Sequence, residues 1–141
     1  MPVDVKYHIS ATAHGGRDGD SKTDDGKFAV KLSTPKELGG AGGDGNNPEQ
    51  LFAAGYAACF LGAIKNVAGK EKMTVPPDTA VHATVGIGPR SEGGFGLTVE
   101  LKVTMPGVDH AQAQALVDKA HQVCPYSNAT RNNIDIKPTV V

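Results

Sequence analysis

Apolar and polar residues alternate with a period of two in three stretches of the chain, residues 3–13, 79–88 and 95–105. This period is typical of a strand that buries one face, so each stretch predicts a half-buried β-strand. Residues 27–33 and 134–140 predict two shorter strands, and the polar stretch 17–26 predicts a loop or hairpin connection. The turn-forming residues 91–94 join the second and third stretches, which therefore predict an antiparallel hairpin.

The longest predicted helix starts with three helix-initiating residues. Asn47 suits the cap, Pro48 suits the first helical position, and Glu49 places an acid in the first turn. The pattern continues to about Gly69, and almost no charge interrupts it before Lys65. Because a helix that is apolar on every side has to be buried, we expect this one at the centre of the fold.

A second helix is predicted from His110 to about Val123, with Asp109 as its cap. Pro125 disfavours helical geometry in the preceding residue, so the helix should end at Cys124. Apolar residues recur at spacings of three and four and form the expected core face: Ala113, Leu116, Val117, Ala120 and Val123. The order of strands, helix, strands, helix and strand predicts an α+β fold in a single domain over residues 1–141.

Composition and charge narrow the classes of partner. Aromatic residues make up 5% of the chain and Trp is absent, so large core residues are scarce. Burial against a second subunit would therefore help to stabilise the fold. Lys and Arg number 14 against 15 Asp and Glu, with no block of like charge, so neither nucleic acid nor an anionic membrane is an expected partner. The first residues lack the pattern of a secretory signal, and no later run approaches the length of a bilayer span. We therefore expect a cytoplasmic protein.

Two cysteines, Cys59 and Cys124, are the first candidates for chemistry. The cytosol keeps thiols reduced, so a purely structural disulfide is not expected. Three interpretations remain: two unrelated buried thiols, a metal site that uses the spacing of His121 and Cys124, and a redox pair. One His and Cys pair falls short of the four ligands of structural zinc, and the position of Cys59 inside an apolar helix favours the redox pair.

Two other motifs match known sites only superficially. Cys124-Pro-Tyr-Ser is similar to a monothiol glutaredoxin site, but there the cysteine starts a helix, and no helix is predicted after Pro125. Residues 40–45 fit the glycine pattern of a dinucleotide-binding loop, yet they lack the preceding strand and the later acidic residue. We expect a flexible connection there, and neither an organic cofactor nor a metal.

Three segments together resemble the organic hydroperoxide resistance (Ohr) branch of the OsmC-like superfamily. Residues 47–60, NPEQLFAAGYAACF, and residues 123–131, VCPYSNATR, are similar to its two signature segments. HGGRDG at residues 14–19 resembles its N-terminal arginine segment, and chain length and element order agree throughout. The resemblance implies an OsmC-like fold of antiparallel sheets and two main helices, the central one buried in an intertwined homodimer.

The same resemblance implies an activity, the reduction of organic hydroperoxides to alcohols. Cys59 takes the role of peroxidatic cysteine and Cys124 that of resolving cysteine, with Arg17 and Glu49 as the polar pair that activates Cys59. The implied reductant is a dihydrolipoyl-type dithiol rather than thioredoxin. Two alternatives keep the fold without this activity: a dimer that binds hydrophobic molecules, and a stoichiometric thiol sensor.

The chemistry explains why these residue types are required. A free cysteine has a pKa of about 8.5, and burial raises it, so a nearby cation is needed to form the thiolate. Arg17 can supply that charge and Glu49 can hold its guanidinium. The organic part of the peroxide needs an apolar wall, for which the candidates are Leu51, Phe52, Phe60 and Tyr126.

Helix geometry raises the question of which chain supplies Glu49. Ten residues separate Glu49 from Cys59, which is about 15 Å along one straight helix. If two copies of the helix cross antiparallel near Ala54, Glu49 of one subunit comes level with Cys59 of the other. The small residues around 53–62 permit such an approach, but they could equally pack under the sheet of their own chain, or Arg17 alone could bridge the gap.

Overall fold

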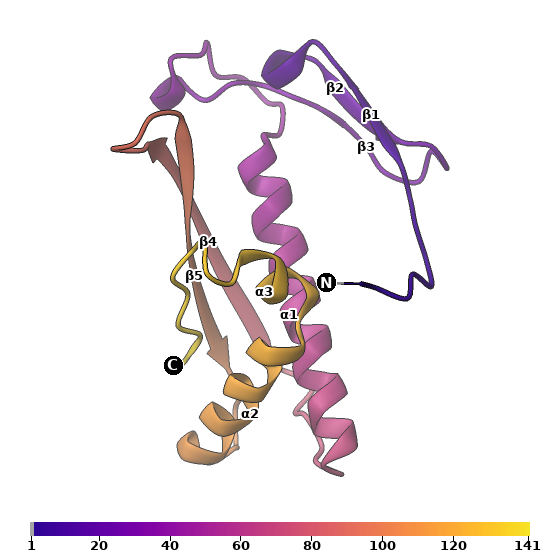
Figure 1. The fold of residues 1–141 in the computed structure, drawn as a ribbon, viewed down its shortest axis with the longest axis vertical. Helices are drawn as coiled ribbons and strands as arrows, with labels where there is room; N and C mark the ends of the chain where they lie inside the picture. Colours follow the sequence, from indigo (N-terminus) through magenta and orange to yellow (C-terminus); the bar gives the residue numbers. More distant parts are fainter. Residues whose placement is uncertain (1) are drawn as a thin grey trace. The chain divides into compact units, whose positions relative to one another are not determined.

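The computed structural model describes residues 2–141, which form two compact units divided between Leu51 and Phe52 (Figure 1). The first unit contains a small sheet and two single-turn helices. The second contains the long helix α1 from Phe52 onward, a β-hairpin and two further helices. The expectation of one domain over residues 1–141 stays a prediction.

The sheet of the first unit has the order β1-β2-β3, and both neighbouring pairs are antiparallel. Short 3-10 helices, η1 and η2, follow β1 and β3. The bounds of these elements are β1 Ala11–His14, η1 Gly16–Asp18, β2 Asp20–Thr23, β3 Ala29–Lys31 and η2 Lys36–Leu38.

Two strand predictions in this unit were wrong. The expected half-buried strand over residues 3–13 is a strand only at its end, and its apolar residues are exposed, Val3 by 78% and Tyr7 by 75%. Residues 17–26, expected to be a loop or hairpin connection, contain the strand β2, whose sequence Asp-Ser-Lys-Thr is polar on both faces. An alternating pattern indicates a strand with one buried face. It therefore misses a strand that has no buried face, and it predicts a strand wrongly where the alternating segment has no partner strand.

None of the described residues up to Leu51 is buried. A small sheet needs an apolar face packed against something else to be stable. The first unit therefore contains no core of its own.

Helix α1, Pro48–Lys70, starts where the sequence predicted. The Oδ1 atom of Asn47 accepts a hydrogen bond from the backbone N–H of Gln50 at 2.8 Å, and Oε1 of Gln50 accepts one from the N–H of Asn47 at 3.0 Å. This reciprocal arrangement is a capping box. It fixes the first turn, in which Glu49 lies.

Only one face of α1 is buried within the chain, and the expected burial of its other side against a second subunit stays a prediction. The buried face consists of Tyr56, Phe60, Ala63, Ile64, Val67 and Ala68. On the opposite face Ala54, Ala58 and Gly62 are exposed. This row of small side chains has no cover among the described residues.

The length of α1 also corrects the expectation that no run approaches a bilayer span. Its 23 residues and a mean hydropathy of 1.4 over 18 of them are sufficient by length and composition alone. The alanines of α1 raise the mean hydropathy although each buries little surface. A core helix of a water-soluble protein passes the same test.

The second sheet is built on the predicted hairpin of β4, Ala80–Pro89, and β5, Phe95–Thr104, which pair antiparallel over their whole length. A short strand β6, Thr139–Val140, pairs parallel with β5. The last strand is therefore shorter than the predicted range 134–140, and this sheet is mixed rather than wholly antiparallel.

Helix α2, His110–Val123, has the predicted bounds, and Asp109 caps it by accepting a hydrogen bond from the N–H of Gln112 at 3.2 Å. Four of its five predicted core residues are buried, but Val123 is 44% exposed. A further helix, α3, Pro125–Thr130, follows at once with Cys124 at its N-cap. The expectation of no helix after Pro125 was wrong, because proline is well suited to the first helical position.

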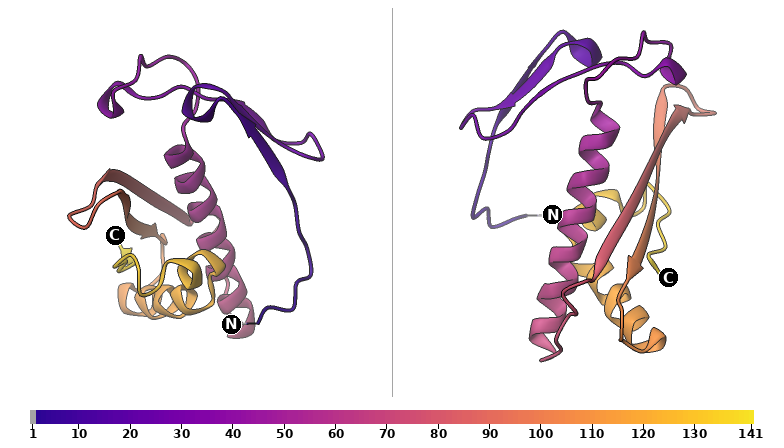
Figure 2. Two further views of the ribbon diagram at one scale, coloured as in Figure 1. Left: turned by 45° about the horizontal axis from the view of Figure 1, so that its top comes forward. Right: turned by 180° about the vertical axis from the view of Figure 1, so that it is seen from behind.

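The core of the second unit lies between α1, α2 and one face of β5. Alternate residues of β5, Val99, Leu101 and Val103, pack with the buried face of α1 and with α2. Figure 2 shows α2 and α3 beside the lower part of α1 in both views. The corner between α2 and α3 therefore faces the middle of α1.

The capping box leads to a stability prediction. We expect Asn47→Ala to lower the free energy of unfolding by about 1 kcal/mol, because the N–H of Gln50 loses its partner. Asn47→Asp keeps a side-chain acceptor and should retain most of that stability. Urea unfolding of the three proteins measures the difference, and an alanine variant as stable as the parent would contradict it.

Candidate active site

The two cysteines meet in the second unit. The Sγ atoms of Cys59 and Cys124 lie 3.7 Å apart, and both thiols are free. Cys59 is partly exposed in the middle of α1, whereas Cys124 is fully buried. A disulfide bond is about 2.05 Å long, so only a small movement separates this contact from a covalent bond.

The position of Cys124 follows from the residues around it. Cys124 has extended geometry, with φ −62° and ψ 124°, as expected of a residue before a proline. Its N–H donates to the carbonyl of Ala120 at 2.9 Å and its carbonyl accepts from the N–H of Asn128 at 2.9 Å. Cys124 therefore ends one helix and starts the next, with its side chain held at the corner.

The surroundings of Cys59 disfavour its ionised form. Burial raises the pKa of the Cys59 thiol, and the neighbouring Cys124 adds to the effect. A backbone hydrogen bond from Tyr126 opposes this shift by favouring the thiolate. Burial is the largest contribution, so an additional positive charge is required before Cys59 can be a good nucleophile.

Arg17 and Glu49 form a two-point ion pair in the first unit. Nη1 of Arg17 donates to Oε2 of Glu49 at 2.9 Å, and Nη2 donates to Oε1 at 2.7 Å. The side chains are 36% and 14% exposed, respectively. Such parallel hydrogen bonds fix the orientation of a guanidinium as well as its distance.

The turn that carries Arg17 depends on two glycines. Gly15 has φ 71°, and a Cβ at Gly19 would lie 1.7 Å from the carbonyl oxygen of His14. A side chain would therefore be strained at Gly15 and is excluded by contact at Gly19. Asp18 connects this turn to Thr34, because its Oδ1 accepts a hydrogen bond from the N–H of Thr34 at 3.0 Å.

Each partner shifts the titration of the other. The hydrogen bonds from Arg17 lower the pKa of Glu49, although partial burial opposes them. The hydrogen bonds to Glu49 raise the pKa of Arg17. Both groups are therefore charged throughout the physiological range.

The four residues expected to form an apolar wall fall into different environments. Phe52, Tyr56 and Tyr126 form an aromatic cluster with ring centroids 5.6 to 6.2 Å apart. Tyr126 is 39% exposed, but Phe60 is fully buried in the core. Leu51 is partly exposed and lies at the end of the first unit.

A group of polar side chains on the helices that carry the cysteines was not predicted from the sequence. The hydroxyl of Tyr56 lies 2.8 Å from Oγ of Ser127, which also lies 2.8 Å from Nδ1 of His121. Oγ1 of Thr130 lies 3.3 Å from the hydroxyl of Tyr56. One signal was present in the sequence, since a tyrosine inside an apolar helix usually needs a partner for its hydroxyl.

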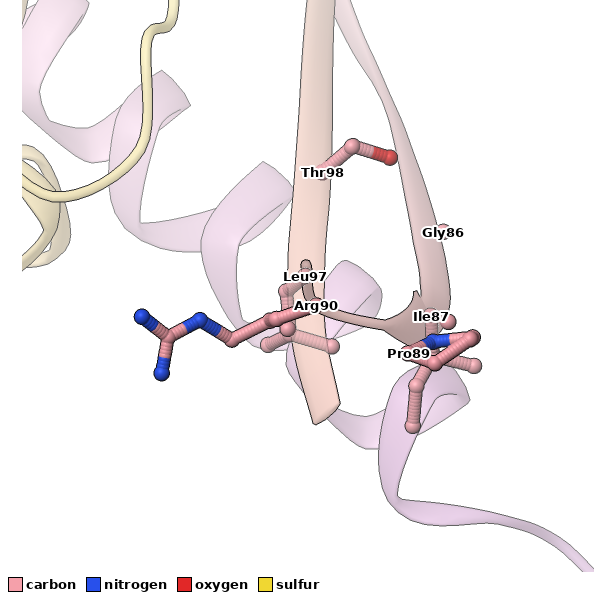
Figure 3. Close-up of a pocket in the computed structure, with 8 residues that line it drawn as sticks. Gly86, Ile87, Pro89, Arg90, Leu97 and Thr98 are labelled. Carbon is pink, nitrogen blue, oxygen red and sulfur yellow. The ribbon is translucent and has the colours of Figure 1, made fainter. Parts of the chain in front are cut away.

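A hollow of about 400 Å³ lies at the end of the β4–β5 hairpin, lined by residues such as Ile87, Arg90 and Leu97 (Figure 3). Neither cysteine lines it. Within residues 2–141, no three His, Cys, Asp or Glu side chains gather as a metal site, and Nδ1 of His121 is engaged by Ser127.

Comparison with known proteins identifies the family. The model of the OsmC-like protein family matches residues 40–139. An organic hydroperoxide resistance protein of Xanthomonas axonopodis pv. citri is 59% identical, over 99% of this chain and 97% of that protein. The chain belongs to the organic hydroperoxide resistance branch of the OsmC-like family. The resemblance of its three segments is thereby confirmed.

Solved structures of this family confirm the α+β fold. The organic hydroperoxide resistance protein of Elizabethkingia anophelis is 53% identical with a TM-score of 0.91, and the match covers 98% of each chain. The OhrB protein of Bacillus subtilis is 41% identical with a TM-score of 0.88, covering 97% of this chain and 100% of that one. The OsmC-like fold therefore extends over 97 to 98% of the chain.

The ion pair gives a prediction with a defined dependence on pH. Because the pKa of Glu49 is lower in the folded state, the pair stabilises the fold fully above the ordinary glutamate pKa of about 4.3. That stabilisation is lost as the pH falls through the lowered pKa. We expect Glu49→Gln to lower the free energy of unfolding by about 1 kcal/mol at neutral pH, a modest value because Arg17 is partly exposed. In acid the variant and the parent should become equally stable.

Urea unfolding between neutral pH and about pH 3 measures this convergence. The matched control is Glu92→Gln, which removes a charge from the more exposed pair with Arg90, 53% and 75% exposed. The control should differ little from the parent at any pH. A cost of Glu49→Gln that stays constant into acid would contradict the prediction.

Proposed function

We propose that this chain is a cysteine-based peroxidase that reduces organic hydroperoxides and protects the cell against them. The observation that carries the proposal is the 3.7 Å contact between Cys59 and Cys124. It occurs in a family whose relatives are named for organic hydroperoxide resistance. Two free thiols in contact suit a reaction that alternates between dithiol and disulfide.

The proposed reaction has three steps. The thiolate of Cys59 attacks the peroxide, the O–O bond breaks, the alkoxide leaves as an alcohol with the proton that Cys59 released, and Cys59 becomes a sulfenic acid. The sulfur of Cys124 then attacks that of Cys59, the S–O bond breaks, and water leaves with the proton of Cys124. A dihydrolipoyl-type dithiol reduces the disulfide by thiol exchange and is itself oxidised to a disulfide.

Arg17 and Glu49 are proposed to activate the first step. Burial raises the pKa of Cys59, so a cation close to the sulfur would favour the thiolate. Glu49 engages two of the five N–H donors of Arg17, which leaves three for a thiolate and a peroxide oxygen. Phe52 and Tyr126 supply apolar surface beside the cysteine pair, whereas the full burial of Phe60 argues for a core role.

We further propose that the protein works as a homodimer in which Glu49 serves the partner's Cys59. Glu49 and Cys59 lie in one helix, about 15 Å apart along its axis. Two observations support a partner: residues 2–51 contain no buried side chain, and Ala54, Ala58 and Gly62 leave an exposed face on α1. Small residues allow two helices to approach closely.

We also propose that the protein works in the cytoplasm, because a cycle that ends in a dithiol reductant suits that compartment.

The two cysteines should differ in what their loss does. Cys59→Ser should lower hydroperoxide consumption by about three orders of magnitude or more, since the nucleophile is gone. Cys124→Ser should react once at a rate close to that of the parent and then accumulate sulfinic acid on Cys59. Peroxide loss and protein mass, followed with dihydrolipoamide as reductant, measure both effects.

Three outcomes of this assay would separate the proposal from its alternatives. A parent that never consumes hydroperoxide would favour a ligand-binding protein. One disulfide per subunit without turnover would indicate a thiol sensor. Equal single-turnover rates for Cys59→Ser and Cys124→Ser would overturn the assigned roles.

A mixed dimer tests which subunit supplies Glu49. Combining a Glu49→Ala subunit with a Cys59→Ser subunit places both defects in the same half, so one intact site should restore about half of the parent activity. The control combines Cys59→Ser with Cys124→Ser, which leaves no complete cysteine pair because the two sulfurs belong to one chain. A Glu49→Ala and Cys59→Ser mixture as inactive as this control would contradict action across the interface.

A further inference from the structure

A chain of buried hydrogen bonds links the helices that carry the two cysteines. Tyr56 and Ser127 are both 0% exposed, and their hydroxyl oxygens lie 2.8 Å apart. Oγ of Ser127 continues the chain to Nδ1 of His121 at 2.8 Å. Thr130 adds a hydroxyl 3.3 Å from that of Tyr56. We call Tyr56, Ser127 and His121 the hydroxyl–imidazole chain.

The hydroxyl–imidazole chain has a regular relation to the sulfurs. Tyr56 precedes Cys59 by three residues in α1, and Ser127 follows Cys124 by three residues across α3. His121 precedes Cys124 by three residues at the end of α2. Residues three apart share one face of a helix. The hydrogen bonds therefore cross between α1 and the α2–α3 corner about one helical turn from the sulfur contact.

Arg131 reinforces the same corner. Its Nη2 donates to the backbone carbonyl of His121 at 2.5 Å, and its Nη1 donates to Oδ1 of Asn128. One guanidinium thus joins the last turn of α2 to α3. Burial and the nearby charge of Arg131 lower the pKa of His121, so its ring is neutral near pH 7 and shares one hydrogen bond with the hydroxyl of Ser127.

Packing alone does not require these polar groups. A phenylalanine and an alanine would fill nearly the same volume, and buried hydroxyls cost free energy unless they are paired. A fully paired network contributes a defined geometry instead, because its bonds are short and directional. The geometry that this network fixes is the spacing of the two helices on either side of Cys59 and Cys124.

We propose that Tyr56, Ser127 and His121 are positioning residues that hold Cys124 in line with the oxidised sulfur of Cys59. The use of this positioning in the cell rests on the proposed peroxidase function. The network itself raises the rate at which Cys124 displaces any leaving group from the sulfur of Cys59.

A disulfide reagent measures this rate of attack by Cys124 without a hydroperoxide. The thiol of Cys59, the more exposed of the two, attacks 4,4′-dithiodipyridine, forms a mixed disulfide and releases one thiopyridone. Cys124 then attacks the sulfur of Cys59, the mixed disulfide breaks, and a second thiopyridone leaves with the proton of Cys124. The absorbance of thiopyridone gives both rates, and protein mass confirms the internal disulfide.

Tyr56→Phe and Ser127→Ala each remove one hydroxyl from the network. We expect the second release to slow by about fivefold or more in either variant, while the first release stays within about twofold of the parent. The double variant should slow by less than the product of the two single effects, because both changes break the hydrogen bond between Tyr56 and Ser127. With a hydroperoxide as oxidant, both variants should accumulate sulfinic acid on Cys59 at a lower dose.

Two controls separate positioning from general destabilisation. Ile64→Val trims a fully buried core residue of α1 that takes no part in the network, and Ser91→Ala removes an exposed hydroxyl at the hairpin. Both should keep the second rate of the parent. Equal slowing in Ile64→Val, or an unchanged second rate in both folded network variants, would overturn the proposal. A parent that forms the disulfide but consumes no hydroperoxide would remove the proposed function and leave the positioning role intact.

Discussion

The packing of α1 against the corner between α2 and α3 is the contact on which the cysteine pair depends. Two sulfurs in van der Waals contact at 3.7 Å arise only because Tyr56 and Phe60, on either side of Cys59, are fully buried against that corner. Close packing keeps such a spacing narrow, since a core does not deform continuously. A reaction that needs a closing movement of less than about 2 Å then requires little reorganisation of the protein.

The same packing creates an electrostatic problem for Cys59. An apolar helix that stabilises the fold also raises the pKa of the thiol within it, and the one hydrogen bond from Tyr126 only partly offsets this. A fixed cation in the core of one chain would itself be costly to bury. Arg17 instead lies in the first unit, paired with Glu49 and partly exposed, so its charge is preserved without deep burial. In the proposed homodimer, the charge of Arg17 and the sulfur of Cys59 would be brought together by assembly.

Local signals predicted the parts of the fold that local chemistry determines. Asn47 and Asp109 mark helix starts through hydrogen bonds to residues three positions on, and both hydrogen bonds are present in the structure. Strand β2 escaped prediction because its four polar residues take their conformation from β1 and β3 on either side. Helix α3 escaped because Pro125 was interpreted only as a stop signal, although the same residue starts the next helix.

The network of Tyr56 shows why the site was harder to predict than the fold. Tyr56 and Ser127 are 71 residues apart in the chain, and neither spacing nor composition indicates that their hydroxyls meet. Both lie in segments whose resemblance to a family draws attention to the cysteines, so the residues three positions away pass as ordinary core. Burying these hydroxyls nevertheless requires more of the fold than burying apolar side chains. A buried hydroxyl without a partner destabilises the fold by more free energy than a buried methyl group contributes. A pair of polar groups kept in an apolar contact between helices is therefore best explained by the geometry that it imposes on the sulfurs beside it.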